Sequence, residues 1–351
     1  MNKIPMIGAL AASAVFSAHS AEMTPYIVNG TDTSTSVYPS FSSIYTYANF
    51  DDGTYLYGKR CGATILDADY ILTAAHCVSN QDINEFNRLF TIVLPQLDDE
   101  ASFDSSSEIQ ATTKYWVSDI YVHSGYDSEQ FENDIAILKL ETSLSVPSSA
   151  YAQFVANESQ YRGESGDVFA AVGHGRTTTY SDDTTVLQEA NLSLVSNADC
   201  GYGGTAPATQ LCMEGEVVNS LEKATCSGDS GGPLYWTSGT QYQVGITSYG
   251  PSTSYGGCGS TSVNAATSVF TEVVDYTSWI DDIKNGITTN AIVYSPSETQ
   301  RNYYRQNYTV NNDVLEQQTT SSSSSSSSGG SVPLWASVFL LGAAFIRRYK
   351  K

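Results

Sequence analysis

Short runs of β-forming residues fill the chain from residue 27 to about residue 284. Clusters of glycine, proline, asparagine and aspartate separate them. This rhythm is typical of a β-barrel or a β-sandwich. The segment 273–283 instead has apolar residues at helical spacing, which predicts a helix at the end of the β region. The clearest β-type runs are 41–47, 63–66, 70–73, 90–93, 135–140, 168–172 and 242–247.

The composition supports a folded, acidic protein. Apolar residues make up 41% of the 351 residues, which is enough for a core. Sixteen Lys and Arg stand against 37 Asp and Glu, so the net charge is −21. A chain this acidic is not expected to bind nucleic acid or anionic lipid surfaces.

The first 26 residues are expected to be removed. Lys3 precedes the largely apolar run 4–16, and Ala18-His19-Ser20 fits the small-x-small rule, which predicts a signal peptide over 1–20. Residues 21–26 then form a short propeptide. Export leads to an oxidising compartment, so the six cysteines are expected to form disulfides.

The C-terminal end carries a second predicted targeting signal, in addition to the signal peptide. A linker over 286–328, rich in Thr, Asn, Gln, Tyr and Ser, is expected to be solvated and flexible. Gly329-Gly330 follow, then the apolar run 332–346 and the basic end 347–351. The run is shorter than the ~20 residues of a membrane-spanning helix. Together, 329–351 resemble the GlyGly-CTERM sorting tail of Gram-negative bacteria, which a membrane-embedded protease removes; a permanent anchor is the alternative.

Three sequence motifs supply the parts of an acyl-transfer site. His76 lies in Thr73-Ala74-Ala75-His76-Cys77, and Asp134 stands at the mouth of the apolar run 135–138. Ser230 lies in Gly228-Asp229-Ser230-Gly231-Gly232-Pro233, whose glycines allow close approach of a reacting carbonyl. A serine nucleophile, an imidazole base and an orienting acid together can transfer acyl groups.

These motifs resemble the three signatures of chymotrypsin-like (trypsin-fold) serine proteases, in that family's order of His, Asp and Ser. Ile27-Val28-Asn29-Gly30 resembles the mature N-terminus of that family, and Ser248-Tyr249-Gly250 its substrate-binding strand. The resemblance covers residues 27–285. It implies two antiparallel six-stranded β-barrels with a C-terminal helix, followed here by the flexible stalk and the short hydrophobic tail.

The resemblance also assigns roles to residues. Ser230 is the nucleophile, His76 the base and Asp134 the residue that orients the base. Gly228 and Ser230 give the oxyanion-hole N–H groups. Ser248 binds the Asp134 carboxylate. After a cut before Ile27, the new ammonium pairs with Asp229. The implied disulfides are Cys61–Cys77, Cys200–Cys212 and Cys226–Cys258.

The specificity pocket departs from that of trypsins. Ala224, followed by Thr225, occupies the floor where trypsins carry an aspartate. Gly250 and Ser268 are expected as walls, beside Tyr249. This uncharged pocket favours an apolar or aromatic side chain before the cut, with a small aliphatic one second. An Arg or Lys preference would need an acid from elsewhere.

The sequence therefore predicts a secreted, monomeric serine endopeptidase that acts on proteins or peptides, at the surface or outside of a Gram-negative bacterium, after transient anchoring by its tail. No cofactor and no metal are expected; Asp98-Asp99-Glu100 is interpreted as a solvated acidic loop, with calcium binding as the alternative. His123 and His174 are interpreted as packing residues. A surface-bound binding protein on the same fold is the competing function.

Overall fold

The computed structural model describes residues 27–103, 106–162, 168–178, 185–201, 206–251, 256–261, 266–307 and 347–350. The predicted signal peptide, the propeptide, the later part of the linker and the apolar run of the tail lie outside these described residues. No helix within them is long and apolar enough to cross a membrane.

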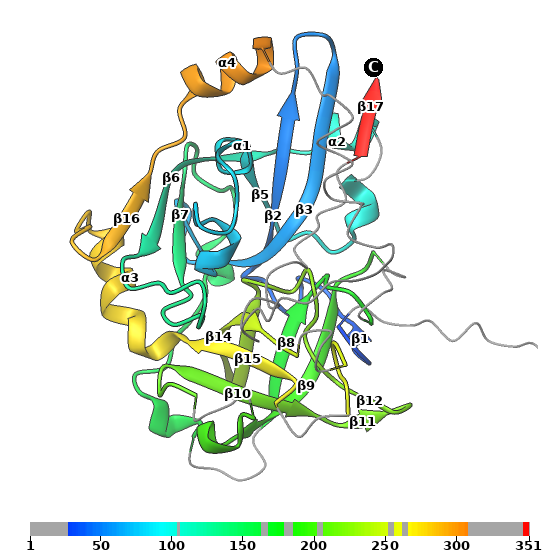
Figure 1. Cartoon of the computed structure of the whole chain (residues 1–351), viewed down its shortest axis with the longest axis vertical. Coiled ribbons are helices and arrows are strands. Elements are labelled where there is room, and N and C mark those ends of the chain that lie inside the picture. Colours follow the sequence, from blue (N-terminus) through cyan, green and yellow to red (C-terminus); the bar gives the residue numbers. More distant parts are fainter. Residues whose placement is uncertain are drawn as a thin grey trace, which may run out of the picture.

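Two closed six-stranded antiparallel β-barrels stand one above the other in Figure 1, which confirms the predicted fold class. The first barrel runs β6–β5–β2–β3–β4–β7 and closes where β7 pairs with β6. Its strands are β2 (Phe41–Asn49), β3 (Thr54–Ile65), β4 (Tyr70–Thr73), β5 (Thr91–Pro95), β6 (Tyr115–His123) and β7 (Ala136–Leu140).

The second barrel runs β9–β10–β15–β14–β13–β8 and closes where β8 pairs with β9. Its strands are β8 (Phe169–Gly173), β9 (Gln188–Val195), β10 (Gln210–Gly215), β13 (Pro233–Ser238), β14 (Thr240–Tyr249) and β15 (Ser268–Glu272). The short elements at its margin are β1 (Thr31–Asp32), which pairs with β9, and the hairpin of β11 (Val217–Val218) with β12 (Leu221–Glu222).

Each barrel closes around its own apolar core, because alternate side chains of a strand point inward. Aliphatic residues dominate the first core, and aromatic residues contribute more to the second. The predicted helix appears as a 3₁₀ turn, Val273–Tyr276, followed by α3 (Thr277–Lys284). Helix α3 returns to the first barrel and buries Trp279, Ile280 and Ile283 in that core.

The structure differs from the linker expected over 286–328. Strand β16 (Ala291–Tyr294) adds an antiparallel edge to β6, and helix α4 (Glu298–Asn307) follows it along the first barrel, as Figure 1 shows. The remaining helices, α1 (Glu85–Leu89) and α2 (Ser106–Ala111), lie in connections of the same barrel. Strand β17 (Arg347–Lys350) pairs with the start of β3.

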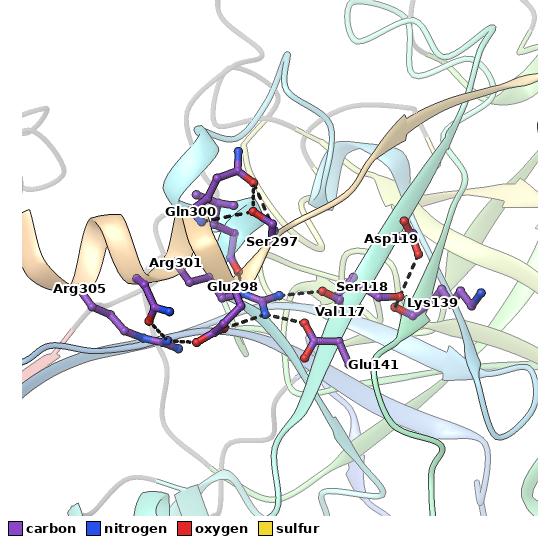
Figure 2. A network of polar contacts seen from close by, with 12 residues as sticks. Val117, Ser118, Asp119, Lys139, Glu141, Ser297, Glu298, Gln300, Arg301 and Arg305 are labelled. Carbon is purple, nitrogen blue, oxygen red and sulfur yellow. Dashed lines mark hydrogen bonds and ion pairs between the residues drawn. The ribbon is translucent and has the colours of Figure 1, made fainter.

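A buried arginine explains why this part of the expected linker is packed. Arg301 of α4 is 1% exposed, and its guanidinium donates to the carbonyl oxygen of Val117 (2.8 Å) and to Glu141 (2.5 Å), as Figure 2 shows. It also donates to the carbonyl oxygen of Leu89 at 2.6 Å. It also lies 4.7 Å from the centre of the Trp116 ring. The extension is thus held by polar and cation–π contacts, and a search for apolar residues overlooks such contacts.

Candidate active site

A buried carboxylate organises the junction between the two barrels. Asp134, just before β7, is fully buried, and its Oδ2 lies 2.7 Å from Nδ1 of His76. Its Oδ1 accepts from the backbone N–H of His76 at 2.9 Å. Ser248, near the end of β14, donates its hydroxyl to Oδ2 at 2.6 Å. The two barrels therefore share one acid, and the sequence-predicted residues His76, Asp134 and Ser248 meet here.

The charge of Asp134 sets the protonation of the imidazole. Burial lowers the pKa of His76, but the Asp134 charge and hydrogen bond, together with the Asp82 charge, raise it, and the pKa lies above its usual value. An ionised carboxylate can only accept, so Nδ1 carries the proton in the neutral ring. Nε2, which lies 3.7 Å from the Sγ of Cys77, is then unprotonated and able to act as a base.

Glycines bring the serine segment against the chain that leads to His76. The carbonyl of Ser230 accepts from the N–H of Gly62 on β3 at 2.8 Å. A Cβ on Gly231 would lie 2.1 Å from the Thr73 hydroxyl and 3.2 Å from the nitrogen of Ala74. Only glycine fits there, and this close approach brings the serine segment against residues 73 and 74, which lead into the 3₁₀ turn Ala75–Cys77 that carries His76. Within the described residues the structure has no hydrogen bond between the Ser230 hydroxyl and His76.

The turn before Ser230 presents backbone donors. Gly228 has φ of +107°, a conformation that side chains disfavour. The N–H groups of Asp229, Gly231 and Gly232 donate to carbonyl oxygens, whereas within the described part of the chain those of Gly228 and Ser230 have no protein acceptor. Two free donors on a tight turn suit a developing oxyanion.

The family model for trypsin matches residues 27–280. The chain belongs to the trypsin family of serine endopeptidases. Chymotrypsin-like elastase family member 1 of Bos taurus is 32% identical over 278 residues, which cover 75% of this chain and 90% of the relative. Trypsin-1 of Astacus astacus is 32% identical over 260 residues, covering 72% and 98%. The CLIP domain-containing serine protease B4 of Anopheles gambiae is 32% identical over 238 residues, 64% of this chain and 62% of that relative.

The expected activation residues of this protease converge on one glycine. Ile27 is fully buried, and its nitrogen, an amide in the continuous chain, lies 3.4 Å from the carbonyl oxygen of Gly175. The carboxylate of Asp229 accepts from the N–H of Gly175 at 2.7 Å and of Cys226 at 2.8 Å. Burial raises the pKa of Asp229 to about 6, although both hydrogen bonds oppose this. Ile27 and the buried Asp229 thus share Gly175 as a hydrogen-bond partner, through its carbonyl oxygen and its N–H group respectively.

The expected pocket residues also lie together. The Ser268 hydroxyl accepts from the N–H of Thr225 at 2.8 Å and lies 3.0 Å from its hydroxyl. Ala224 is fully buried and exchanges backbone hydrogen bonds with Val28. A Cβ on Gly250 would lie 3.0 Å from the Thr267 carbonyl oxygen, so any larger residue would crowd that wall. None of the four predicted floor and wall residues is charged.

Three disulfides confirm the predicted pairing: Cys61–Cys77, Cys200–Cys212 and Cys226–Cys258. His174 packs edge-on against Phe41, with ring centres 5.4 Å apart, and burial lowers its pKa to about 3. His123 packs against the aromatic rings of Tyr276 and Trp279. Both histidines therefore lie in aromatic surroundings apart from the Asp134 centre.

The acidic loop uses its carboxylates within the protein. Glu100 binds Lys59 at 3.0 Å and accepts from Tyr45, while Asp98 accepts from the N–H of Thr35. Asp99 accepts from the N–H of Ala101. Each of the three carboxylates thus has a protein donor, and Glu100, whose side chain is only 13% exposed, is packed against β3 through Lys59 and is not solvated as expected.

An aromatic corner that was not predicted from the sequence lies at the site. The ring of Phe131 meets that of His76 edge-on, with centres 5.8 Å apart, and lies 5.3 Å from the ring of Tyr249. Phe131 stands three residues before Asp134, so its position beside that motif was the available signal.

Proposed function

We propose that this protein is an exported serine endopeptidase that uses Ser230, His76 and Asp134. The observation that carries the proposal is the Asp134 centre, because one buried carboxylate binds both the His76 ring and its backbone and receives the Ser248 hydroxyl. An acid so placed fixes the tautomer that a serine nucleophile needs.

The mechanism follows from these positions. The Ser230 hydroxyl oxygen attacks the substrate carbonyl carbon while Nε2 of His76 takes the hydroxyl proton. Asp134 stabilises the resulting imidazolium, and the N–H groups of Gly228 and Ser230 bind the oxyanion. His76 then gives its proton to the leaving amine, and a water molecule repeats the steps in reverse to release the acid.

We propose a preference for apolar or aromatic residues before the cut. The hydroxyls of Thr225 and Ser268 engage one another, and Ala224 offers only a methyl group. A buried ammonium or guanidinium from substrate would find no counter-charge among these residues, which is costly. This disfavours the alternative Arg or Lys preference.

The ends of the chain enter the proposal as processing signals. Residues 1–20 direct export, 21–26 are cut off before Ile27, and the GlyGly-type tail 329–351 guides surface sorting before a membrane-embedded protease removes it. The protease domain extends from 27 to 285 with the β16–α4 extension attached. The enzyme works as a monomer outside the cell of a Gram-negative bacterium.

Peptide substrates that differ only in the residue before the cut test this proposal. Wild type should cleave after Phe, Tyr or Leu with kcat/KM at least about tenfold above that for Arg or Lys. Ala224→Asp should move the preference toward Arg and Lys, whereas Ser230→Ala should cleave none of them. If wild type binds the peptides but leaves them intact, the competing binding function is correct. Faster cleavage after Arg would overturn the proposed pocket.

A further inference from the structure

Phe131 holds a conformation that its own side chain disfavours. It lies in the loop between β6 and β7 with φ of +54°, a region that bulky residues rarely occupy. A residue keeps such a strained backbone conformation only where contacts with its surroundings hold it in place. The question is what keeps its ring beside His76.

A buried amide supplies the restraint. Gln210, the first residue of β10, is 1% exposed. Its Nε2 donates to the carbonyl oxygen of Phe131 at 3.1 Å, and its Oε1 accepts from the hydroxyl of Tyr249 at 3.1 Å. A carbonyl can only accept, so the amide has one workable orientation. One side chain thus ties a loop of the first barrel to β14 of the second.

The backbone of Gln210 is itself held by hydrogen bonds and by strand pairing. Its carbonyl oxygen accepts from Nδ2 of Asn197 at 3.0 Å and from Nη2 of Arg162 at 3.3 Å. It also pairs with Thr271 of β15, whose hydroxyl donates to the Asp134 carbonyl oxygen at 3.0 Å. The amide is therefore anchored to the same strands that hold the Asp134 centre.

We propose that Gln210 is a positioning residue that holds Phe131 and Tyr249 as an aromatic corner for an apolar substrate side chain. The inference rests on the proposed function. An extended peptide alternates its side chains. If the residue before the cut enters the pocket at Ala224, the residue preceding it faces the other way, toward His76 and Phe131. An apolar side chain there buries surface against both rings.

The test compares two peptides that differ only in that preceding residue, Leu against Gly, and records the ratio of their kcat/KM values. Gln210→Met keeps the volume and removes both hydrogen bonds, so the ratio should fall about threefold to tenfold. Tyr249→Phe removes one bond and should give a smaller fall. Gln243→Met, a buried glutamine elsewhere in β14, is the matched control and should leave the ratio unchanged.

Gln210→Glu adds a readout that a merely structural role would not move. An ionised glutamate faces the Phe131 carbonyl with an oxygen and loses the bond, whereas the protonated acid can donate to it and still accept from Tyr249. The Leu/Gly ratio of this variant should recover as pH falls. The wild-type ratio should stay flat, because the titration of His76 cancels between the two peptides.

Two failures remain distinguishable. An active enzyme whose ratio stays at the wild-type value in Gln210→Met and in Gln210→Glu at every pH overturns the role of Gln210 and leaves the proposed protease intact. Wild type that hydrolyses neither peptide overturns the proposed function and this inference together. A Gln210→Met variant that does not fold leaves the decision to Gln210→Glu and Tyr249→Phe.

Discussion

Asp82 is a second acid that acts on His76. Its carboxylate accepts from the Tyr126 hydroxyl at 3.1 Å, and burial raises its pKa to about 6. Its charge is one of the causes that raise the pKa of His76. The base of the proposed mechanism works only when neutral, so activity should appear as pH rises through the pKa of His76.

Replacing Asp82 with Asn removes this charge and should lower the pKa of His76. The acid limb of the kcat/KM profile should then move to lower pH, with the plateau changed less than about twofold. Profiles between pH 4 and 9 measure this (about two and a half units on each side of the usual histidine pKa). Glu129→Gln, an equal charge change at an exposed position, is the control. If the acid limb of the kcat/KM profile does not move in Asp82→Asn, the Asp82 charge does not contribute to the pKa of His76.

At the scale of elements, the β16–α4 extension behaves as part of the first barrel. Arg301 satisfies two backbone carbonyls and the partly exposed Glu141. Arg305 pairs with Glu298, whose side chain is 61% exposed and which also lies 3.6 Å from Arg301. Both members of the Arg305–Glu298 pair are more exposed than those of the Arg301–Glu141 pair, so solvent screens the Arg305–Glu298 pair more.

Arg301→Met should therefore lower the free energy of unfolding by about 2–4 kcal/mol, because buried carbonyls lose their donor. Arg305→Met should lower it by less than about 1 kcal/mol. Urea unfolding in a Ser230→Ala background, which prevents self-digestion, gives both values. Equal losses in the two variants would mean that α4 is held by its surface contacts alone.

The contrast between expected and observed elements has a physical origin. The apolar pattern predicts a strand only over 63–66, but strand β3 begins at Thr54. Its first part is not predicted because Lys59 and Arg60 interrupt the apolar pattern. Inside the structure Lys59 pairs with Glu100, and Arg60 donates to the oxygens of its neighbours, Asn87 among them. Apolar patterns locate strands that bury aliphatic surface, and they miss segments whose buried charges find partners far along the chain.

The same reasoning applies to the site. The sequence places His76, Asp134 and Ser248 in motifs, and the structure brings these three residues together. Gln210 has no motif, because its contacts reach residues 79 and 39 positions away. Only the folded barrels bring these groups together.

At the scale of the whole molecule, activation links the N-terminus to the turn that carries Ser230. In the continuous chain Ile27 and Asp229 meet at Gly175 without an ammonium. A cut between Tyr26 and Ile27 would free an ammonium at Gly175 that can pair with the buried carboxylate, on which the Lys59 charge already acts. The Gly228 turn is already formed in the continuous chain. Tyr26 also suits the uncharged pocket, which points to self-cleavage.

N-terminal sequencing tests this activation. Wild type should begin at Ile27, and Ser230→Ala should retain residues upstream of it. Tyr26→Asp should keep an otherwise intact enzyme as precursor, because an acid does not suit the pocket. Ser230→Ala that begins at Ile27 would assign the cut to another protease or to the signal peptidase. Active wild type with a different first residue would contradict the scheme.

Covalent labelling with a fluorophosphonate tests the central claim most directly, since only a serine activated by its base attacks the phosphorus. Mass spectrometry of the labelled wild-type enzyme should find the adduct on Ser230, with none after denaturation in urea. His76→Ala should slow labelling by about a thousandfold or more. An adduct on another residue, or equal labelling of folded and unfolded protein, would contradict the account.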